Sequence, residues 1–396
     1  MRYTIGQLAE IIDGDRGKNY PKQDEFYPQG YCLFLNTGNV TKEGLTFEEN
    51  QFITKEKDEA LRKGKLKRGD IVYTTRGTVG NAGYYNSNVP YENVRINSGM
   101  VILRANGEIV DARFLYQILK SEYYRPYFKQ YCTGSAQPQL PIKNFSQIYL
   151  NVPDIITQHR IADILSAYDD LIENNQKQIK LLEEAAQRLY KEWFVDLRFP
   201  GHENTKIVDG VPEGWNEKTL SQVANVIMGQ SPKSEFYNSE KKGLPFHQGV
   251  GSYGVRFVMD DIYSTSYTRI AEPNSILFSV RAPVGRLNIT KNKVVIGRGL
   301  AAINQADGCQ SYLYYLLKNR FFKDNIVGNG SIFASVSKDE LLNQKFLIPE
   351  RNLMMQFEKI VSQMDKQIEN LDSKNKKLIE ARDRLLPKLM SGEVEV

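Results

Sequence analysis

Two arginines, each in a turn between apolar runs, are the side chains of this sequence best placed to do chemistry. Arg76 lies in IVYTTRGTVGNAGYY and Arg281 in SILFSVRAPVGRLNIT. The β-branched and aromatic residues on either side predict strands, and the glycines predict the turns. A turn between paired strands presents a guanidinium at a fixed place, where it can bind a base edge or a phosphate. The alternative is a solvated hairpin arginine without a ligand.

A Gly-Ser segment, a short turn and a strand that ends in proline follow in each half. The first is TGSAQPQLPIKNFSQIYLNVP, ending at Pro153, and the second is GNGSIFASVSKDELLNQKFLIP, ending at Pro349. Gln137 and Gln139 carry amides of the kind that bind adenine edges. An ordinary β-turn is the alternative for this segment. The two prolines mark the places where a β-rich part stops and a helix begins.

No catalytic or cofactor-binding pattern accompanies these turns. The nearest match to a P-loop, GDRGK at 14–18, has the wrong length and no Ser or Thr after the lysine. No GxGxxG leads from a strand into a helix. The adjacent carboxylates Asp169 and Asp170 have no neighbouring base, so a solvated helix rim is expected for them. The sequence therefore indicates a binding protein without a catalytic site of its own.

Metal-ligand spacing is also missing. The histidines His159, His202 and His247 lie far from one another and from the cysteines, and surface positions are expected for them. The cysteines Cys32, Cys132 and Cys309 lack CxxC spacing. Reduced, structural thiols are expected, and no metal site.

The composition fits a soluble protein of two or three domains. The chain has 396 residues, of which 41% are hydrophobic and 25% charged, with a net charge of +5. Positive charge is in excess over 1–153 and 206–349, whereas 154–205 is acidic. No run of apolar residues is long enough to span a membrane, and a cytoplasmic location is expected. Basic parts separated by helices are compatible with nucleic-acid binding but do not require it.

A heptad pattern from Arg160 to Trp193 predicts a long helix with one apolar seam. Its seam positions are Ile161, Leu165, Tyr168, Ile172, Asn175, Ile179, Leu182, Ala186, Leu189 and Trp193. Adding 196 to each number gives a second seam at the C-terminus, formed by Phe357, Val361, Met364, Ile368, Leu371, Asn375, Leu378, Arg382, Leu385 and Leu389. Many residues are identical at this offset, among them Asp169 and Asp365. The chain is therefore an internal duplication.

The two helices can pair with each other in an antiparallel register. If facing residue numbers add up to 550, Asn175 meets Asn375, Trp193 meets Phe357 and Tyr168 meets Arg382, and the other seam positions pair apolar with apolar. We expect Asn175 and Asn375 to set this register, because a buried amide pair favours one alignment over the others. The helices would then hold the two β-rich parts at a fixed separation.

The sequence thus predicts an α+β protein with two similar α/β domains separated by a pair of long antiparallel coiled-coil helices, pseudo-two-fold symmetric. The expected parts are a first domain at 1–153, a helix at 154–198, a linker at 199–214, a second domain at 215–349 and a second helix at 350–391. Each domain opens with an amphipathic helix, for which Gly14 and Gly229 are expected as C-caps.

The whole chain resembles the specificity (S) subunit of type I restriction-modification systems. The resemblance is carried by RIADILSAYDDLIENNQKQIKLLEEAAQRLYKEWFVDLRFPGHE, by VPEGWNEKTLSQV, by both arginine turns and by the first Gly-Ser segment. It implies two target recognition domains, each of which reads one half of a bipartite DNA sequence. It also implies that the helices dock two modification subunits, which bind S-adenosylmethionine and methylate adenine, and that restriction subunits powered by ATP and Mg join them.

Carried onto this sequence, the resemblance implies DNA-facing residues in both domains: Thr75, Arg76, Thr78, Gly134, Ser135, Gln137, Arg281, Gly330 and Ser331. It implies contact with the modification subunits for an exposed acidic helix face that contains Asp169, Asp170, Glu183 and Glu184. A solvated coiled-coil flank is the alternative for that face. The rival function is a stand-alone sequence-specific DNA-binding or regulatory adaptor protein, and a nuclease is disfavoured because clustered carboxylates are missing.

Overall fold

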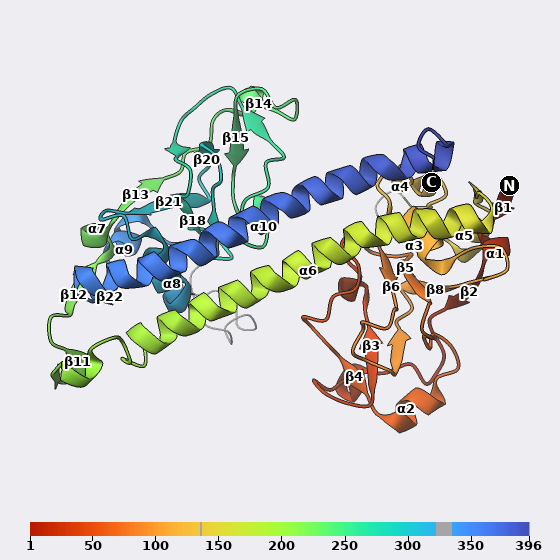
Figure 1. Ribbon diagram of the computed structural model, residues 1–396, viewed down its shortest axis with the longest axis horizontal. Coiled ribbons are helices and arrows are strands. Elements are labelled where there is room, and N and C mark those ends of the chain that lie inside the picture. The colour runs from red at the N-terminus through yellow and green to blue at the C-terminus, as the bar shows by residue number, and fades with distance from the viewer. Residues whose placement is uncertain (135–136, 322–334, 396) are drawn as a thin grey trace. The chain divides into compact units, whose positions relative to one another are not determined.

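The computed structural model describes residues 1–134, 137–321 and 335–395, which divide into two compact units (Figure 1). Unit 1 comprises Met1–Gln176 and Ser373–Val396, and unit 2 comprises Lys177–Asp372. Two long helices, α6 (Ile155–Phe194) and α10 (Arg351–Ser391), contribute one part to each unit. Each unit therefore contains a β-rich part and a segment of both helices.

The other elements of unit 1 alternate short strands with short helices. They are β1 (Arg2–Thr4), α1 (Ile5–Leu8), β2 (Ala9–Asp13), η1 (Gln23–Glu25), β3 (Cys32–Leu35), η2 (Thr37–Asn39), β4 (Phe52–Ile53), α2 (Lys55–Ala60), β5 (Ile71–Thr74), β6 (Ala82–Tyr84), β7 (Val94–Ile96), β8 (Met100–Ala105), α3 (Ala112–Lys120), α4 (Arg125–Lys129), α5 (Ile142–Ser146) and β9 (Tyr149–Asn151).

Unit 2 repeats much of this order. Its other elements are η3 (His202–Asn204), β10 (Ile207–Val208), β11 (Val211–Pro212), β12 (Asn216–Thr219), α7 (Leu220–Val223), β13 (Ala224–Met228), η4 (Ser234–Phe236), β14 (Tyr237–Asn238), β15 (Leu244–His247), η5 (Val250–Ser252), β16 (Tyr263–Ser264), β17 (Ile270–Ala271), β18 (Ile276–Ser279), β19 (Leu287–Ile289), β20 (Val294–Ile296), β21 (Leu300–Gln305), α8 (Gln310–Phe321), α9 (Lys338–Leu342) and β22 (Lys345–Ile348).

The sheets have matching topologies in the two units. A four-stranded antiparallel sheet has the order β2-β8-β5-β6 in unit 1 and β13-β21-β18-β19 in unit 2. A second sheet in each unit contains one parallel pair, β3 with β7 and β15 with β20. The first and last strands of each β-rich part pair antiparallel, β1 with β9 and β12 with β22. The duplication predicted from the sequence thus extends to strand order.

The core of each β-rich part continues into the long helices. In unit 1, Tyr73 of β5 stacks on Phe145 of α5 with ring centroids 4.9 Å apart, and the same cluster contains Leu165 of α6 and Leu386 of α10. In unit 2, Phe357 of α10 is fully buried in the cluster that contains β18 and α8 residues. Residues of the long helices therefore belong to the core of each unit. Burying one such side chain contributes roughly 1.5–3 kcal/mol to the free energy of unfolding.

The two long helices run antiparallel within each unit. In unit 1, the Asn175 Nδ2 donates a hydrogen bond to Asn375 Oδ1 at 2.7 Å, and the Asn375 Nδ2 donates to the Ile172 carbonyl. In unit 2, the rings of Trp193 and Phe357 have centroids 5.9 Å apart. Both pairs have numbers that add up to 550, the alignment expected from the sequence. That the asparagines select this alignment stays a prediction.

Two local expectations were wrong. The helices α1 and α7 end after one turn, because the β-branched residues that follow pair with β8 and β21. Gly14 and Gly229 are therefore not C-caps; a Cβ atom on either would lie 2.2 or 2.1 Å from a carbonyl oxygen of the crossing turn. Arg382 binds Asp169 and Asp383, and its expected pairing with Tyr168 stays a prediction.

The segment expected as a linker at 199–214 has structure of its own. It contains η3 and the β10–β11 hairpin, and Phe199 packs on Trp215 with ring centroids 5.4 Å apart. Asp209 and Gly210, both at positive φ, form the turn of this hairpin. Composition alone did not distinguish a structured turn region from a flexible connection.

Candidate nucleic-acid interface

The arginine turn of unit 1 connects β5 to β6 and is closed by one threonine hydroxyl. The Thr74 hydroxyl donates to the Thr78 carbonyl and accepts a hydrogen bond from the Asn81 amide at 2.9 Å. The Gly80 amide donates to the Thr74 carbonyl at 3.0 Å. Gly80 has a φ of 99°, which favours glycine. Arg76 is thereby held at an exposed position on a rigid turn.

Unit 2 builds the same turn between β18 and β19. The Ser279 hydroxyl donates to the Pro283 carbonyl at 2.6 Å and accepts from the Arg286 amide at 2.8 Å. The Gly285 amide donates to the Ser279 carbonyl at 3.0 Å, and its φ is 87°. Each bond has its counterpart 205 residues earlier. Two separate parts of the chain thus present an exposed arginine, Arg76 or Arg281, on the same frame.

Each arginine turn lies between two other loops. In unit 1, the Thr75 amide donates to the Gly99 carbonyl and the Leu140 amide donates to the Thr75 carbonyl, both at 2.9 Å. In unit 2, the Val280 amide donates to the Gly299 carbonyl and the Val336 amide donates to the Val280 carbonyl, again at 2.9 Å. The end of the Gly-Ser segment and the β7–β8 or β20–β21 turn therefore flank the arginine in both units.

Most of the predicted residues that the structure describes are exposed in this loop cluster. Arg76, Thr78, Gly134 and Gln137 are exposed in unit 1, as is Arg281 in unit 2. Gly134 has a φ of 84° and follows Thr133, which forms an antiparallel bridge with Gln139. Ser135, Gly330 and Ser331 lie outside the described residues.

Thr75 differs from the other predicted residues. It is only 5% exposed, and its hydroxyl donates to the Gly99 carbonyl at 3.1 Å. Its side chain supports the turn from inside and does not face a ligand. The sequence expectation that it faces DNA does not match this position, because its hydroxyl is bound to the β7–β8 turn.

The sequence reasoning missed three residues of the unit 2 cluster. Gln248, Arg298 and Ser231 come from three loops that meet beside the Arg281 turn, where the Gly299 amide donates to the Gln248 carbonyl at 3.1 Å. The sequence feature that could have indicated this cluster is GRG at 297–299. It aligns with Asn97–Gly99, two hundred residues earlier, in the turn that flanks Arg76.

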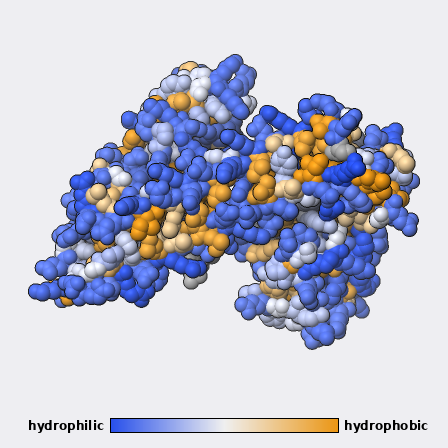
Figure 2. Space-filling view, viewed as in Figure 1, coloured by the Kyte–Doolittle hydropathy of each residue, from blue (hydrophilic) through white to orange (hydrophobic). Residues whose placement is uncertain are grey.

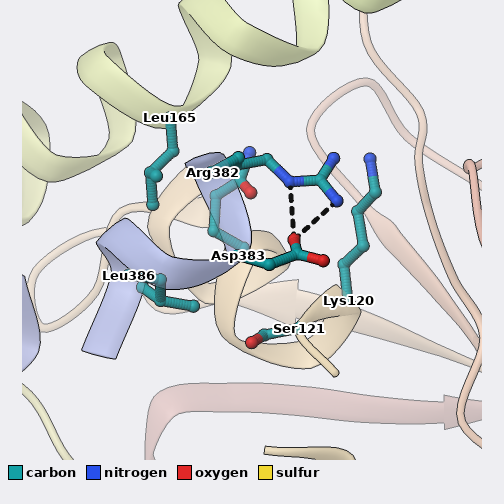
Figure 3. A pocket seen from close by; sticks show the side chains of 7 residues that line it. Lys120, Ser121, Leu165, Arg382, Asp383 and Leu386 are labelled. Atoms are coloured by element: carbon teal, nitrogen blue, oxygen red, sulfur yellow. Dashed lines mark hydrogen bonds and ion pairs between the residues drawn. The ribbon is translucent and has the colours of Figure 1, made fainter. Parts of the chain in front are cut away.

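On the helix side of unit 1, Asp169 is the centre of a polar network. Its carboxylate accepts from Gln117 at 2.7 Å, from Lys120 at 3.2 Å and from Arg382 at 2.6 Å. Burial raises the pKa of Asp169, but the charges of Lys120 and Arg382 outweigh burial, and the pKa lies below its ordinary 3.8. Figure 3 shows Arg382, paired with Asp383, and Lys120 around a hollow of about 10 Å³.

On the helix side of unit 2, an arginine is buried between two acids. Arg256 Nη2 lies 2.5 Å from Asp365, Nη1 lies 3.5 Å from Glu183, and the guanidinium carbon lies 4.0 Å from the centre of the Tyr314 ring. Asp169 and Glu183 are therefore ion-paired and about a fifth exposed, which corrects the expectation of an exposed acidic face. Asp170 is exposed, and Glu184 pairs with Arg188 at 3.4 Å.

The histidines and cysteines occupy varied positions. His247 is fully buried, contrary to expectation, with Nδ1 2.8 Å from Ser252 Oγ and Nε2 3.2 Å from Asp260 Oδ1. Cys32, Cys132 and Cys309 are free thiols, and burial raises the pKa of Cys32 to about 12.

Among the described residues, no group of three or more His, Cys, Asp or Glu side chains is arranged to hold a metal ion. No described helix is long and apolar enough to cross a membrane.

Comparison with known proteins identifies the family. The family model described as type I restriction modification DNA specificity domain matches residues 1–184 and 212–381. The type I restriction enzyme HindI specificity subunit of Haemophilus influenzae is 26% identical, with 98% of this chain and 100% of the relative covered. The type I restriction enzyme MjaVIII specificity subunit of Methanocaldococcus jannaschii is also 26% identical, with 100% and 93% covered.

A solved structure has the same fold. The crystal structure of the type I restriction-modification system S subunit from M. genitalium aligns with a TM-score of 0.56 at 18% identity, covering 98% of this chain and 95% of that one. The family model matches two segments, in line with the duplication of the arginine turn and the sheets. The chain belongs to the family of type I restriction-modification specificity subunits, which bind DNA and are not catalytic.

Proposed function

We propose that each unit reads one half of a bipartite DNA sequence through the loop cluster around its arginine turn. The observation that carries this proposal is that the same hydrogen-bonded turn is built twice, on Thr74 and on Ser279. Arg76 and Arg281 are exposed, and neither side chain has a hydrogen bond or ion pair within the described part of the chain. A guanidinium so presented can bind guanine O6 and N7 or a phosphate.

The long helices set the spacing between the two half-sites in this proposal. Neither α6 nor α10 is interrupted where the chain passes from one unit to the other. An uninterrupted helix transmits a fixed length, at a rise of about 1.5 Å per residue. Reading two half-sites then requires a matching number of base pairs between them.

The same helices dock two modification subunits, which hold S-adenosylmethionine, and restriction subunits that use ATP and Mg join the complex in the cytoplasm. Figure 2 shows apolar side chains gathered along the long helices, while hydrophilic ones cover most of the β-rich parts. Ile164 and Ile360, which occupy equivalent positions of the duplication, are 36% and 42% exposed, and Leu171 is 52% exposed. We propose that Ile164, Asp170 and Leu171 of unit 1 contact one modification subunit, and that Ile360 and Glu184 of unit 2 contact the other.

Mapping methylated adenines in cells that carry the complete system tests this function. The expected result is a motif of two short parts separated by several unread base pairs. Inserting one heptad into α6 and one into α10 should lengthen the gap and leave both parts unchanged. A continuous motif, or a gap unaffected by the insertion, would count against the proposal.

Co-purification distinguishes the proposed function from that of a stand-alone adaptor, because only a specificity subunit is expected to co-purify with a methyltransferase.

A further inference from the structure

The backbone at Gln248, just after β15, is fixed to the β20–β21 turn of unit 2. The Gly297 amide donates to the His247 carbonyl at 2.8 Å, and the Gly299 amide donates to the Gln248 carbonyl at 3.1 Å. The Gly299 carbonyl in turn accepts from the Val280 amide, next to Arg281. Gln248, Arg298 and Arg281 are therefore exposed side chains on three loops joined by backbone hydrogen bonds.

The side chain of Gln248 is also held, by a hydrogen bond from Ser231. The Ser231 hydroxyl accepts from the Arg298 amide at 3.2 Å and donates to Gln248 Oε1 at 2.8 Å. The hydrogen bond from Ser231 engages the amide oxygen and orients the amide of Gln248. Gly297 leaves space for the Gln248 amide, because a Cβ atom at position 297 would lie 2.6 Å from Gln248 Oε1.

This arrangement leaves the two N–H donors of Gln248 directed outward. The amide nitrogen has no hydrogen-bond partner among the described residues, and the residue is exposed. An amide whose oxygen is engaged and whose nitrogen is free acts as a donor toward a ligand. Such a donor complements N7 of a purine, O6 of guanine or O4 of thymine in the major groove.

The buried His247 stiffens the loop from which Gln248 projects. Its Nδ1 lies 2.8 Å from Ser252 Oγ and its Nε2 lies 3.2 Å from Asp260 Oδ1, so the imidazole spans both ends of the loop after β15. The imidazole is fully buried, and this Ser–His–Asp arrangement positions a loop. A pre-organised side chain loses less entropy on binding and discriminates better between ligands.

Unit 1 carries a shorter and less exposed amide at the equivalent place. Asn36 occupies the corresponding place after β3, where the Asn97 amide donates to the Leu35 carbonyl at 2.9 Å. The Asn36 side chain instead accepts from the Gly38 amide at 2.7 Å and begins η2. The amide oxygen at this position is therefore held within its own loop in unit 1 and by Ser231 of another loop in unit 2.

We propose that Gln248 is a specificity-determining residue of unit 2, which donates from its amide nitrogen to a base edge within the half-site that unit 2 reads, while Ser231 positions it. This inference rests on the proposed function and assigns one base-reading contact to a named atom. Arg281 and Arg298 flank it on the neighbouring turns.

The test measures binding of the complex with its modification subunits to a panel of duplexes in which each base pair of the mapped motif is changed in turn. For the unchanged protein, one base pair is expected to be discriminated about tenfold by this contact. Gln248→Ala should abolish the preference at that base pair alone. Gln248→Glu, which offers an acceptor, should shift the preference toward cytosine, whose N4 is a donor. Ser231→Ala should weaken the same preference.

Gln344→Ala is the control, because this glutamine lies in the same unit and donates to the Glu340 carbonyl. It should leave the panel unchanged. Unaltered discrimination in Gln248→Ala, or a uniform loss at every base pair in Gln248→Ala and Gln248→Glu alike, overturns the inference. A complex of the unchanged protein without any bipartite preference would instead overturn the proposed function, so the two failures are distinguishable.

Discussion

The two units attach their β-rich parts to the long helices through the same duplicated aspartate, but the cations come from different elements. In unit 1, Asp169 of α6 is paired with Lys120 of α3 and with Arg382 of α10. In unit 2, Asp365 of α10 is paired with Arg256, which comes from a loop of the β-rich part. The residue equivalent to Arg382 is Ala186, which is buried without charge.

This difference shows which residue of the contact between the helix and the β-rich part is the same in both copies. The aspartate is on the helix in both copies, and a buried carboxylate needs a cation nearby. Any element that packs against the helix at that point can supply the cation. The junction therefore tolerates divergence of the β-rich parts while the helices stay alike.

Removing the cation of unit 2 should have the largest effect. Arg256→Ala leaves Asp365 and Glu183 side by side without a counter-charge, and we expect the free energy of unfolding of unit 2 to fall by about 3–5 kcal/mol. Denaturant unfolding followed by tryptophan fluorescence measures this directly, since Trp193 and Trp215 both belong to unit 2. The exposed Arg281→Ala is the control, and a loss of similar size there would contradict the argument.

Neutralising the anion of unit 1 should cost less. In Asp169→Asn, Arg382 keeps Asp383 at 2.8 Å, so we expect a loss of about 1–3 kcal/mol at pH 7. The lowered pKa of Asp169 stabilises unit 1 above its unfolded pKa of about 3.8, and this contribution is lost as pH falls through the folded pKa. Hydrogen exchange of β5 and β8 amides should show a flatter acid dependence in Asp169→Asn than in Asp170→Asn.

The asparagine pair of unit 1 offers a smaller test, of the helix register. Asn375→Ala leaves Asn175 without its partner and should destabilise unit 1 by about 1–2 kcal/mol. The double replacement of both asparagines by leucine should restore or exceed the original stability, because the desolvation cost disappears. Disulfide trapping of helix positions in the double variant would then reveal more than one alignment. A single trapped register would remove the asparagines' proposed role.

The smallest effect is expected at the start of α8. In unit 1, α3 is capped by its own Asp111, whereas in unit 2 the Ser311 and Tyr312 amides donate to Glu358 of α10 at 3.2 and 3.0 Å. Burial raises the pKa of Glu358 above its ordinary 4.5, so its ionisation weakens unit 2 as pH rises through that range.

Glu358→Gln keeps one of the two acceptor oxygens, for the Ser311 or the Tyr312 amide, and removes this titration. At pH 7 the free energy of unfolding should change by less than about 1 kcal/mol. As pH rises from the ordinary pKa of 4.5 through the raised pKa of Glu358, the tryptophan-monitored stability of the variant should fall less than that of the original protein. A steeper fall in the variant would show that the carboxylate is stabilised, not penalised, by its surroundings.

The sequence by itself determined the features that depend on spacing along the chain. A repeat of 196 residues, a heptad seam and a pair of seam asparagines are one-dimensional patterns, and they placed Asn175 beside Asn375 and Trp193 beside Phe357. The arginine turns were also recognisable, since glycine and β-branched residues have local conformational preferences.

Only the tertiary structure decided how the loops and charges are used. Whether Ile11 and Ile12 continue a helix or pair with β8 depends on a strand far along the chain. The inward side of Thr75, the pairing of Asp169 and Glu183, the burial of His247 and the outward amide of Gln248 each depend on partners remote in sequence. Solvation and hydrogen bonding are set by such neighbours, which no local pattern encodes.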